Sequence, residues 1–167
     1  MDFSIRQGSR DEVDRLEPLW RSLREHHVGL PDMQPVRSLQ ASWKHRRSQY
    51  LDWLQKDEYT LLVAARGDEL IGYVVVSLGA GAATWDIGDR TAELETLSVL
   101  ASERGTGVGR ALVEAAAKVA EEAGARTVLV GVAHSNEDAL RFYEREGFEA
   151  FYVELIRRAP SGPSAGG

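Results

Sequence analysis

The chain has 167 residues, of which 43% are hydrophobic and 28% charged, and its formal net charge is −6. This length and composition predict one globular domain with a core of its own. The negative charge argues against nucleic acid as the main partner, because phosphate backbones repel an acidic protein. The chain contains no cysteine, which excludes disulfides, thiolate metal sites and a cysteine nucleophile.

Neither a secretory signal nor a membrane span is indicated. The first twelve residues, MDFSIRQGSRDE, carry several charges and no apolar core. The most apolar stretch, LIGYVVVSLGAGAA, is too short and too rich in glycine to cross a bilayer. We therefore expect a cytoplasmic protein without a membrane partner.

The N-terminal third predicts a short strand and two helices. Residues 3–6 alternate apolar and polar side chains, as a strand does. A helical pattern begins at Ser9, and Pro18 inside it implies either a kink or a later start. Residues 26–35 contain a glycine and two prolines and predict a loop, and residues 36–55 carry a second helical pattern.

The rest of the chain predicts further strands, two more helices and a tail. The expected elements are two strands over 59–78 joined by a turn at Arg66-Gly67-Asp68, a strand over 91–100, a helix over 107–123 stopped by Gly124, a strand over 126–133 that is buried on both faces, a helix from a Ser135–Asp138 capping box to Glu146, and a strand over 147–156. This order predicts a single α/β domain with a mixed sheet over 1–158. The small residues of 159–167 predict a disordered C-terminal tail.

Three glycines, Gly105, Gly107 and Gly109, stand two residues apart between a predicted strand and a predicted helix. A helix start offers unpaired backbone N–H groups and the positive end of the helix dipole, and glycine lets the backbone approach an anion closely. Arg104 adds a fixed cation directly before the turn. The segment therefore predicts a site for a phosphorylated ligand.

Two familiar phosphate-binding loops do not fit this turn. A P-loop requires Lys-Ser/Thr after the glycines, and none follows here. A dinucleotide loop, G-x-G-x-x-G, would need glycine where Arg110 stands. A third interpretation is that the glycines only allow close packing at a strand–helix turn.

The spelling Arg104-Gly105-Thr106-Gly107-Val108-Gly109 resembles the R/Q-x-x-G-x-G/A signature of the GNAT superfamily of acyl-CoA-dependent N-acetyltransferases. The preceding stretch LETLSVLASE resembles the central strand of that family. A second signature, N-x-x-A-x-x-F-Y-x-x-x-G-F, is matched by NEDALRFYEREGF, with Asn136, Ala139, Phe142, Tyr143, Gly147 and Phe148 at its fixed places.

The resemblance implies a fold and an acetyl-CoA site. The fold would be a central mixed sheet of about six to seven strands flanked by about four helices, with two central strands that splay apart to admit the cofactor. The backbone of Leu97, Ser98 and Val99 would pair with the pantetheine arm, and Asn136 and Tyr143 would contact the cofactor. The pyrophosphate would lie on the turn formed by Arg104, Gly105, Thr106, Gly107, Val108, Gly109 and Arg110.

Glu93 and Glu95 are the candidate bases that would remove a proton from the attacking amine. Their spacing of two predicts one common face of a strand, together with Leu97 and Val99. Glu95 is slightly preferred, and the alternative is that either glutamate only supplies surface charge. Tyr143 is, by the resemblance, the candidate general acid for the leaving thiolate, and the alternative is a packed aromatic ring.

The acceptor side is expected near His27, Trp43 and Trp85: by the resemblance, the segment of His27 forms part of the acceptor wall, and aromatic rings beside a carboxylate would suit an amine. The alternative is that His27 only ends a helix, where the dipole favours histidine, and that Trp43 belongs to the apolar stripe of the next helix. His26 and His27 are adjacent, but no further ligand completes a zinc site, so no metal is expected.

The predicted function is acetyl transfer from acetyl-CoA to a primary amine of a small molecule or a peptide. The alternatives are an acyl-CoA-binding sensor without catalysis and, from the glycine turn alone, a nucleotide-binding module. A homodimer formed through the exposed last strand is a further expectation.

Overall fold

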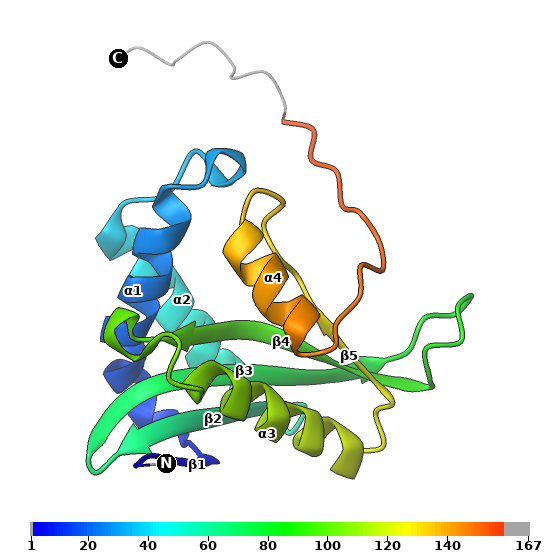
Figure 1. Cartoon of the computed structure of the whole chain (residues 1–167), viewed down its shortest axis with the longest axis horizontal. Coiled ribbons are helices and arrows are strands. Elements are labelled where there is room, and N and C mark those ends of the chain that lie inside the picture. Colours follow the sequence, from blue (N-terminus) through cyan, green and yellow to red (C-terminus); the bar gives the residue numbers. More distant parts are fainter. Residues whose placement is uncertain (1, 159–167) are drawn as a thin grey trace.

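A computed structural model describes residues 2–158 of the chain (Figure 1). Over these residues the sheet has five strands, β1 to β5, paired in chain order. Strands β1 to β4 pair antiparallel with one another, and β5 is parallel to β4. The sheet is therefore mixed, as predicted, but smaller than the predicted six to seven strands. The strands are β1 (Ser4–Gln7), β2 (Tyr59–Arg66), β3 (Glu69–Ala80), β4 (Arg90–Val99) and β5 (Thr127–Val130).

Four α-helices and three short 3₁₀ helices complete the described chain. The pattern that begins at Ser9 divides into a 3₁₀ helix and α1, and Pro18 lies in the first turn of α1, where a missing N–H is tolerated. The later start is therefore the correct alternative. The α-helices are α1 (Glu17–Val28), α2 (Leu39–Trp53), α3 (Val108–Glu122) and α4 (Glu137–Arg145), and the 3₁₀ helices are η1 (Arg10–Leu16), η2 (Pro31–Met33) and η3 (Ala101–Glu103).

The sheet separates two hydrophobic cores. Figure 1 shows α1 and α2 on one face of the sheet and α3 on the other. Successive residues of β2 alternate between the cores: Leu62 and Ala64 belong to the α3 side, and Leu61 and Val63 to the side of α1 and α2. Because both faces are covered, the buried stretches of β2 and β3 are almost wholly apolar.

A β-bulge interrupts β4 at Glu95. Val76 of β3 pairs with Leu94, but Val75 pairs with Thr96, so β4 contains one residue more than β3 at this point. A bulge re-aims the side chains that follow it. Its effect on the candidate site is described below.

The expected last strand, 147–156, does not form. Residues 149–158 contain no helix or strand, which accounts for the smaller sheet. β5 is also shorter than its apolar run, and its four residues are half-buried rather than buried on both faces, because it is the last strand of the described sheet. The expected tail, 159–167, lies outside the described residues.

The predicted capping box before α4 is wrong by one residue. The N-cap is Asn136, whose Oδ1 accepts a hydrogen bond from the backbone N–H of Ala139 at 3.2 Å. Ser135 instead donates its hydroxyl to Asp32 in the α1–α2 connection, and its backbone N–H donates to the other oxygen of Asp32 at 2.9 Å. A contact with a residue far away in the sequence thus replaces the local cap.

Candidate functional site

The glycine turn joins η3 to α3, and two of its glycines have left-handed backbone conformations. The φ angles of Gly105 and Gly107 are 80° and 92°, and Gly107 is the N-cap of α3. A Cβ at either position would meet no atom within 4 Å. These two glycines are therefore required by the backbone conformation and not by close packing.

Gly109 has a different role, because it allows α3 and α4 to approach each other. A Cβ at Gly109 would lie 3.3 Å from Cζ of Phe142 and 3.8 Å from Cγ2 of Val99. The interpretation of close packing thus holds for one of the three glycines. The close approach at Gly109 also brings together the end of β4, the start of α3 and the second half of α4.

The turn presents a row of backbone N–H groups. Within residues 2–158, the N–H groups of Gly105, Gly107, Val108, Gly109 and Arg110 donate to no carbonyl or side chain. Thr106 is different: its N–H donates to the carbonyl of Glu103 at 3.3 Å, and its hydroxyl donates to the same oxygen at 2.7 Å. Free amides at the start of a 15-residue helix form an anion site.

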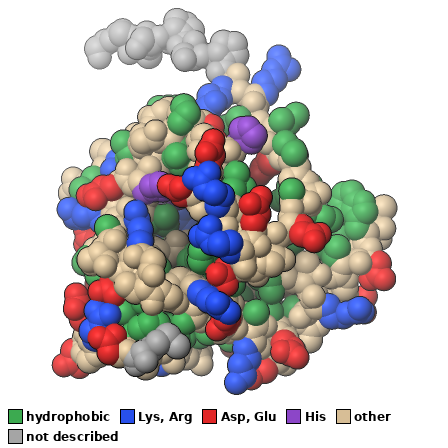
Figure 2. Space-filling view, in the orientation of Figure 1, with side chains coloured by type: hydrophobic (Ala, Val, Ile, Leu, Met, Phe, Trp, Pro, Cys, Tyr) green, Lys and Arg blue, Asp and Glu red, His purple; other side chains and the backbone are tan. Residues whose placement is uncertain are grey.

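The two arginines that flank the turn differ in how they are paired. Arg104 is exposed and reaches Ser22 of α1 at 3.4 Å, and it has no acidic partner within the described chain. Arg110 lies 2.9 Å from Glu114 and 3.9 Å from Glu146. Figure 2 shows basic and acidic side chains interspersed on this side of the molecule, where α4 lies. Arg104 is therefore the flanking cation that remains available to an anion.

β4 and β5 pair over only part of their length. Thr91–Leu94 of β4 pairs with Thr127–Val130, and β4 then continues to Val99 without β5 beside it. On its other edge, Leu97–Val99 still pairs with β3. The backbone N–H and C=O groups of a strand point alternately to its two edges. Some of those in Leu97–Val99 therefore face the side of β4 where β5 is missing and have no strand to pair with. This agrees with the expected separation of the two strands.

The bulge overturns one expectation about the candidate bases. Leu97 and Val99 pack against the core on the α3 side, but Ser98 donates its hydroxyl to the carbonyl of Leu19 in α1. Glu93 and Glu95 precede this change and face α1 and α2. The prediction that the glutamates share a face with Leu97 and Val99 is therefore wrong, because it assumed an unbroken alternation along β4.

Of the two glutamates, Glu95 is the more buried and the one with a hydrogen-bond partner. It is half-buried, and its carboxylate accepts a hydrogen bond from the hydroxyl of Ser77 on β3 at 2.7 Å. The pKa of Glu93 is raised, first because neighbouring atoms remove part of its water and then because Glu95 and Glu154 are negatively charged. Mutual repulsion between carboxylates makes this face attractive to a cation.

Tyr50 of α2 forms a hydrogen bond to the bulge in β4. The buried hydroxyl of Tyr50 donates to Oγ1 of Thr96 at 2.9 Å and lies 3.0 Å from the hydroxyl of Tyr73. The ring of Tyr50 packs on that of Trp53, which in turn stacks on the ring of Tyr59 with 5.0 Å between the ring centroids. The sequence did not point to Ser77 or Thr96, because only the register of β3 and β4 brings them to the bulge. Tyr50 could be expected from the sequence as a pocket aromatic, but not as a partner of the bulge.

α4 bridges the turn and α1. At its start, Oδ1 of Asn136 lies 3.1 Å from Nε2 of His26, which is in the last turn of α1. Further along, Tyr143 packs its ring against Phe142 and Phe148 at centroid distances of 5.0 and 5.3 Å. Burial raises the pKa of Tyr143 to about 12. Tyr143 thus lies beside the α3 side of the sheet, and the glutamates lie on the other side.

The three expected acceptor residues lie on separate elements. His27 is half-buried at the end of α1, and its pKa is lowered by burial and then by the charges of His26 and Arg46. Trp85 is 63% exposed in the β3–β4 connection and meets Phe151 edge to face at 6.0 Å. Trp43 packs on Trp20 at 5.2 Å and lines a groove between α1 and α2.

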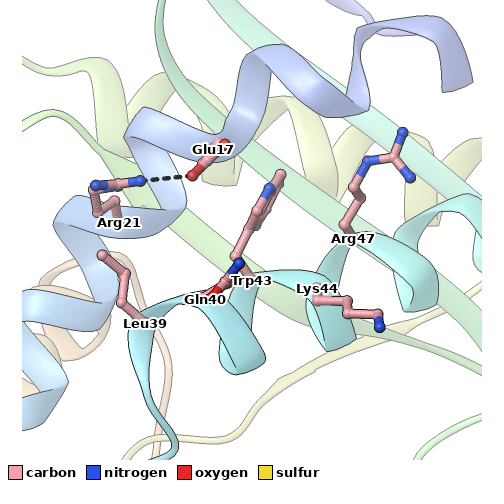
Figure 3. Close-up of a pocket in the computed structure, with 7 residues that line it drawn as sticks. All are labelled: Glu17, Arg21, Leu39, Gln40, Trp43, Lys44 and Arg47. Carbon is pink, nitrogen blue, oxygen red and sulfur yellow. Dashed lines mark hydrogen bonds and ion pairs between the residues drawn. The ribbon is translucent and has the colours of Figure 1, made fainter.

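Figure 3 shows the groove, which has a volume of about 380 Å³. Two of its four charged side chains, Glu17 and Arg21, pair with each other at 2.7 Å, and Arg47 pairs with Asp14 beside the groove. Its charges are thus largely satisfied within the protein. The lining residues are Glu17, Arg21, Leu39, Gln40, Trp43, Lys44 and Arg47.

Neither a metal cluster nor a membrane-spanning helix is present in residues 2–158. The described chain brings no three His, Asp or Glu side chains together in a way that would hold a metal ion. None of its helices combines the length and the apolar character needed to cross a bilayer.

The sequence resembles known acetyltransferases. The sequence model of the Acetyltransferase (GNAT) family matches residues 20–148. An uncharacterized N-acetyltransferase of Mycobacterium tuberculosis is 29% identical over 102 residues, which cover 61% of this chain and 60% of that protein. One from Methanocaldococcus jannaschii is 30% identical over 152 residues, covering 88% of this chain and 61% of that protein. The chain thus spans about 60% of the length of these relatives.

Solved structures share the fold. A variant of the BH1408 protein of Bacillus halodurans matches with a TM-score of 0.80 at 22% identity, over 93% of this chain and 99% of that one. The aminoglycoside N-acetyltransferase AAC(6')-Iy, solved in complex with CoA, matches with a TM-score of 0.72 at 21% identity, over 95% of each chain. At these identities the likeness concerns the fold.

Proposed function

Since this chain belongs to the GNAT acetyltransferase family, we propose that it transfers an acetyl group from acetyl-CoA to a primary amine of a small molecule or a peptide. The observation that carries the proposal is the position of the glycine turn. Its free amides lie at the start of α3, and Gly109 of the same turn lies beside Val99, where β4 runs without β5 beside it: a Cβ at Gly109 would be 3.8 Å from Cγ2 of Val99. A phosphate site and an open strand edge are thus adjacent, as a phosphorylated ligand with a long polar arm requires.

The residues of the turn fit the pyrophosphate of acetyl-CoA. The amides of Gly105, Gly107 and Val108 and the guanidinium of Arg104 would hold the phosphates. The open backbone groups of Leu97–Val99 would pair with the amides of the pantetheine arm. Oδ1 of Asn136 is engaged with Ala139 and His26, so the amide nitrogen of Asn136 is the group left for the arm.

Glu95 is the proposed base. The cofactor supplies an activated acyl group as a thioester, but an alkyl amine with a pKa near ~10.4 is almost wholly protonated at pH 7. Glu95 lies at the bulge, directly before the open part of β4, and Ser77 fixes its carboxylate. It would accept the proton of the amine directly or through a water molecule. Glu93 would add negative charge that attracts the cationic acceptor.

Tyr143 is proposed as a hydrogen-bond donor to the leaving sulfur. With a pKa of about 12, its phenol stays protonated at every pH where the enzyme would work. A thiol has a pKa near ~8.5, so complete proton transfer from such a phenol would be uphill. Donation of a hydrogen bond to the sulfur stabilises the developing charge without that transfer.

An assay for free thiol tests the function, and the absence of cysteine removes any background from the protein. We expect thiol release from acetyl-CoA that depends on one acceptor in a panel of aryl-alkyl amines, peptide N-termini and amino sugars. Glu93→Gln/Glu95→Gln should abolish it, and Tyr143→Phe should lower it about tenfold or more. Binding of acetyl-CoA without turnover of any acceptor would instead favour the acyl-CoA sensor.

A further inference from the structure

Arg46 of α2 is a half-buried cation without an acidic partner. Its guanidinium donates a hydrogen bond to the side-chain oxygen of Gln49 at 3.1 Å, and its Cζ lies 5.6 Å from the centre of the Tyr50 ring. No carboxylate within residues 2–158 forms an ion pair with it, whereas the next residue, Arg47, is paired with Asp14. A half-buried charge without a counter-ion is costly, and a guanidinium has five N–H groups to offer an anion.

The position of Arg46 on α2 places it near the bulge of β4. Arg46 and Tyr50 are four residues apart and therefore share one face of the helix. Figure 1 shows α2 passing behind the sheet, and the hydroxyl of Tyr50 reaches Thr96, the residue after Glu95, at 2.9 Å. Arg46 thus lies one helical turn before the contact of α2 with the bulge, on the face of the sheet that carries Glu93 and Glu95.

Electrostatic effects on two neighbouring groups agree with this position. Burial raises the pKa of the Tyr50 phenol, and the charges of Arg46 and Glu95 act on that pKa in opposite directions. The pKa of His27, at the end of α1, is lowered first by burial and then by the charges of His26 and Arg46. The guanidinium is therefore within electrostatic reach of both the proposed base and the end of α1.

We propose that the acceptor is an amino acid or a related amine with a carboxylate, which Arg46 binds while the amine lies at Glu95. This inference rests on the proposed function and names its substrate class. A guanidinium matches the two oxygens of a carboxylate with two parallel hydrogen bonds. His27, which is uncharged at pH 7, would donate a further hydrogen bond to the same carboxylate.

The opposite charges determine how such a molecule is oriented. Glu93 and Glu95 attract an ammonium group and repel a carboxylate, and Arg46 does the reverse. The reaction is the one already proposed: the amine nitrogen bonds to the acetyl carbon, the C–S bond of the thioester breaks, Glu95 takes a proton of the amine, and CoA leaves as the thiolate. A diamine would instead place its second cation against Arg46, so we expect it to be the poorest of the small acceptors.

The first test compares acceptors that differ only at the end remote from the amine. Thiol release from acetyl-CoA is measured for ω-amino acids of increasing chain length, and for the amino alcohol and the diamine of each length. At the best length we expect the kcat/KM of the amino acid to exceed that of the alcohol by about tenfold or more, with the diamine lowest. Acetyl transfer without a preference for the acid, or with a preference for the diamine, would overturn the inference and leave the proposed function intact.

The second test changes Arg46 itself. Arg46→Gln should lower kcat/KM for the amino acid by about tenfold to a hundredfold and change little for the alcohol. Arg46→Glu should reverse the preference, so that the diamine becomes a better acceptor than the acid. The matched control is Arg47→Gln, which loses only its pair with Asp14 and should keep the order of the wild type. Equal losses for the acid and the alcohol in Arg46→Gln would show that Arg46 is only structural.

A binding measurement separates this inference from the proposed function. The N-acetyl derivatives of the same amino acids and amino alcohols carry no reactive amine, and their binding is measured by isothermal titration calorimetry. We expect the acid derivative to bind the wild type and Arg47→Gln about tenfold or more tightly than it binds Arg46→Gln. That result without turnover of any amine would overturn the proposed function and support the carboxylate site. Equal binding of the acid and alcohol derivatives to the wild type would overturn the inference.

Discussion

Nε2 of His26 lies 3.1 Å from Oδ1 of Asn136, the same oxygen that caps α4 by accepting the N–H of Ala139. Because that oxygen is an acceptor in both contacts, Nε2 of His26 carries the hydrogen. Asn136 is buried, and the two residues are 110 positions apart in the sequence. The bond therefore ties the end of α1 to the start of α4.

The first prediction concerns this bond. Asn136→Ala should lose about 2 kcal/mol of unfolding free energy, roughly half from the helix cap and half from the bond to His26. Asn136→Asp should lose much less, because its carboxylate can accept both hydrogen bonds. Equilibrium unfolding in urea measures both variants. His26→Ala, which removes only one bond, is the control and should fall between them, and equal losses for Ala and Asp would contradict this account.

The second prediction compares the two ends of α3. Gly107 and Gly124 have similar left-handed φ angles of 92° and 77°, and both have open space around them. Replacing either with Glu should cost about 1–2 kcal/mol in backbone strain. Only Gly107→Glu also places a carboxylate where we propose the phosphates bind.

Thermal-shift titration separates these effects. At a hundred times the dissociation constant, acetyl-CoA should stabilise the wild type and Gly124→Glu by about 2.7 kcal/mol. Gly107→Glu should show no such shift. A shift with ATP or NAD, and none with acetyl-CoA, would instead support the interpretation that the turn binds a nucleotide.

The parts of the site that the sequence predicted are those set by local rules. The glycine turn is specified by neighbouring residues, since two of its glycines are needed for φ alone. The bulge at Glu95 depends on the pairing of β4 with β3, which no local pattern gives. The strand predicted over 147–156 did not form for a related reason: its alternating pattern is present, but residues 149–158 do not pair with β5, and an alternating pattern alone does not fix pairing with a particular edge. The predicted Ser135 cap did not form because the hydroxyl of Ser135 bonds to Asp32, which is 103 residues away in the sequence.

The third prediction separates the two glutamates. Glu95→Gln should lower kcat by about a hundredfold or more, because it removes the proposed base. Glu93→Gln should change kcat by less than about tenfold and act mainly on KM, because it removes only attraction for the acceptor. Ser77→Ala should lower kcat several-fold, since the carboxylate of Glu95 loses its 2.7 Å partner. Equal losses of kcat for Glu93→Gln and Glu95→Gln would contradict the assignment of Glu95 as the base.

The fourth prediction concerns acid stability and the ion pairs of Glu12. Its carboxylate accepts hydrogen bonds from Nη1 and Nη2 of Arg6 at 2.9 and 2.7 Å and from the backbone N–H of Ser9 at 3.1 Å. The pKa of Glu12 is lowered to about 2, first by the hydrogen bonds from Arg6. The side chain of Glu12 is 15% exposed, and that of Arg6 is 44% exposed.

Because the folded-state pKa lies below the ordinary value of 4.5, Glu12 stabilises the fold fully above pH 4.5. This contribution is lost as the pH falls from about 4.5 to about 2. Glu12→Gln should therefore be about 2 kcal/mol less stable at pH 7, a figure reduced for the exposure of Arg6. The difference from the wild type should shrink steadily in urea unfolding at pH 4 and pH 3. Asp52→Asn, which breaks the exposed pair with Lys56, is the control and should change stability by less than about 0.5 kcal/mol. A difference for Glu12→Gln that stays constant from pH 7 to pH 3 would show that the charge of Glu12 is not the source of its effect.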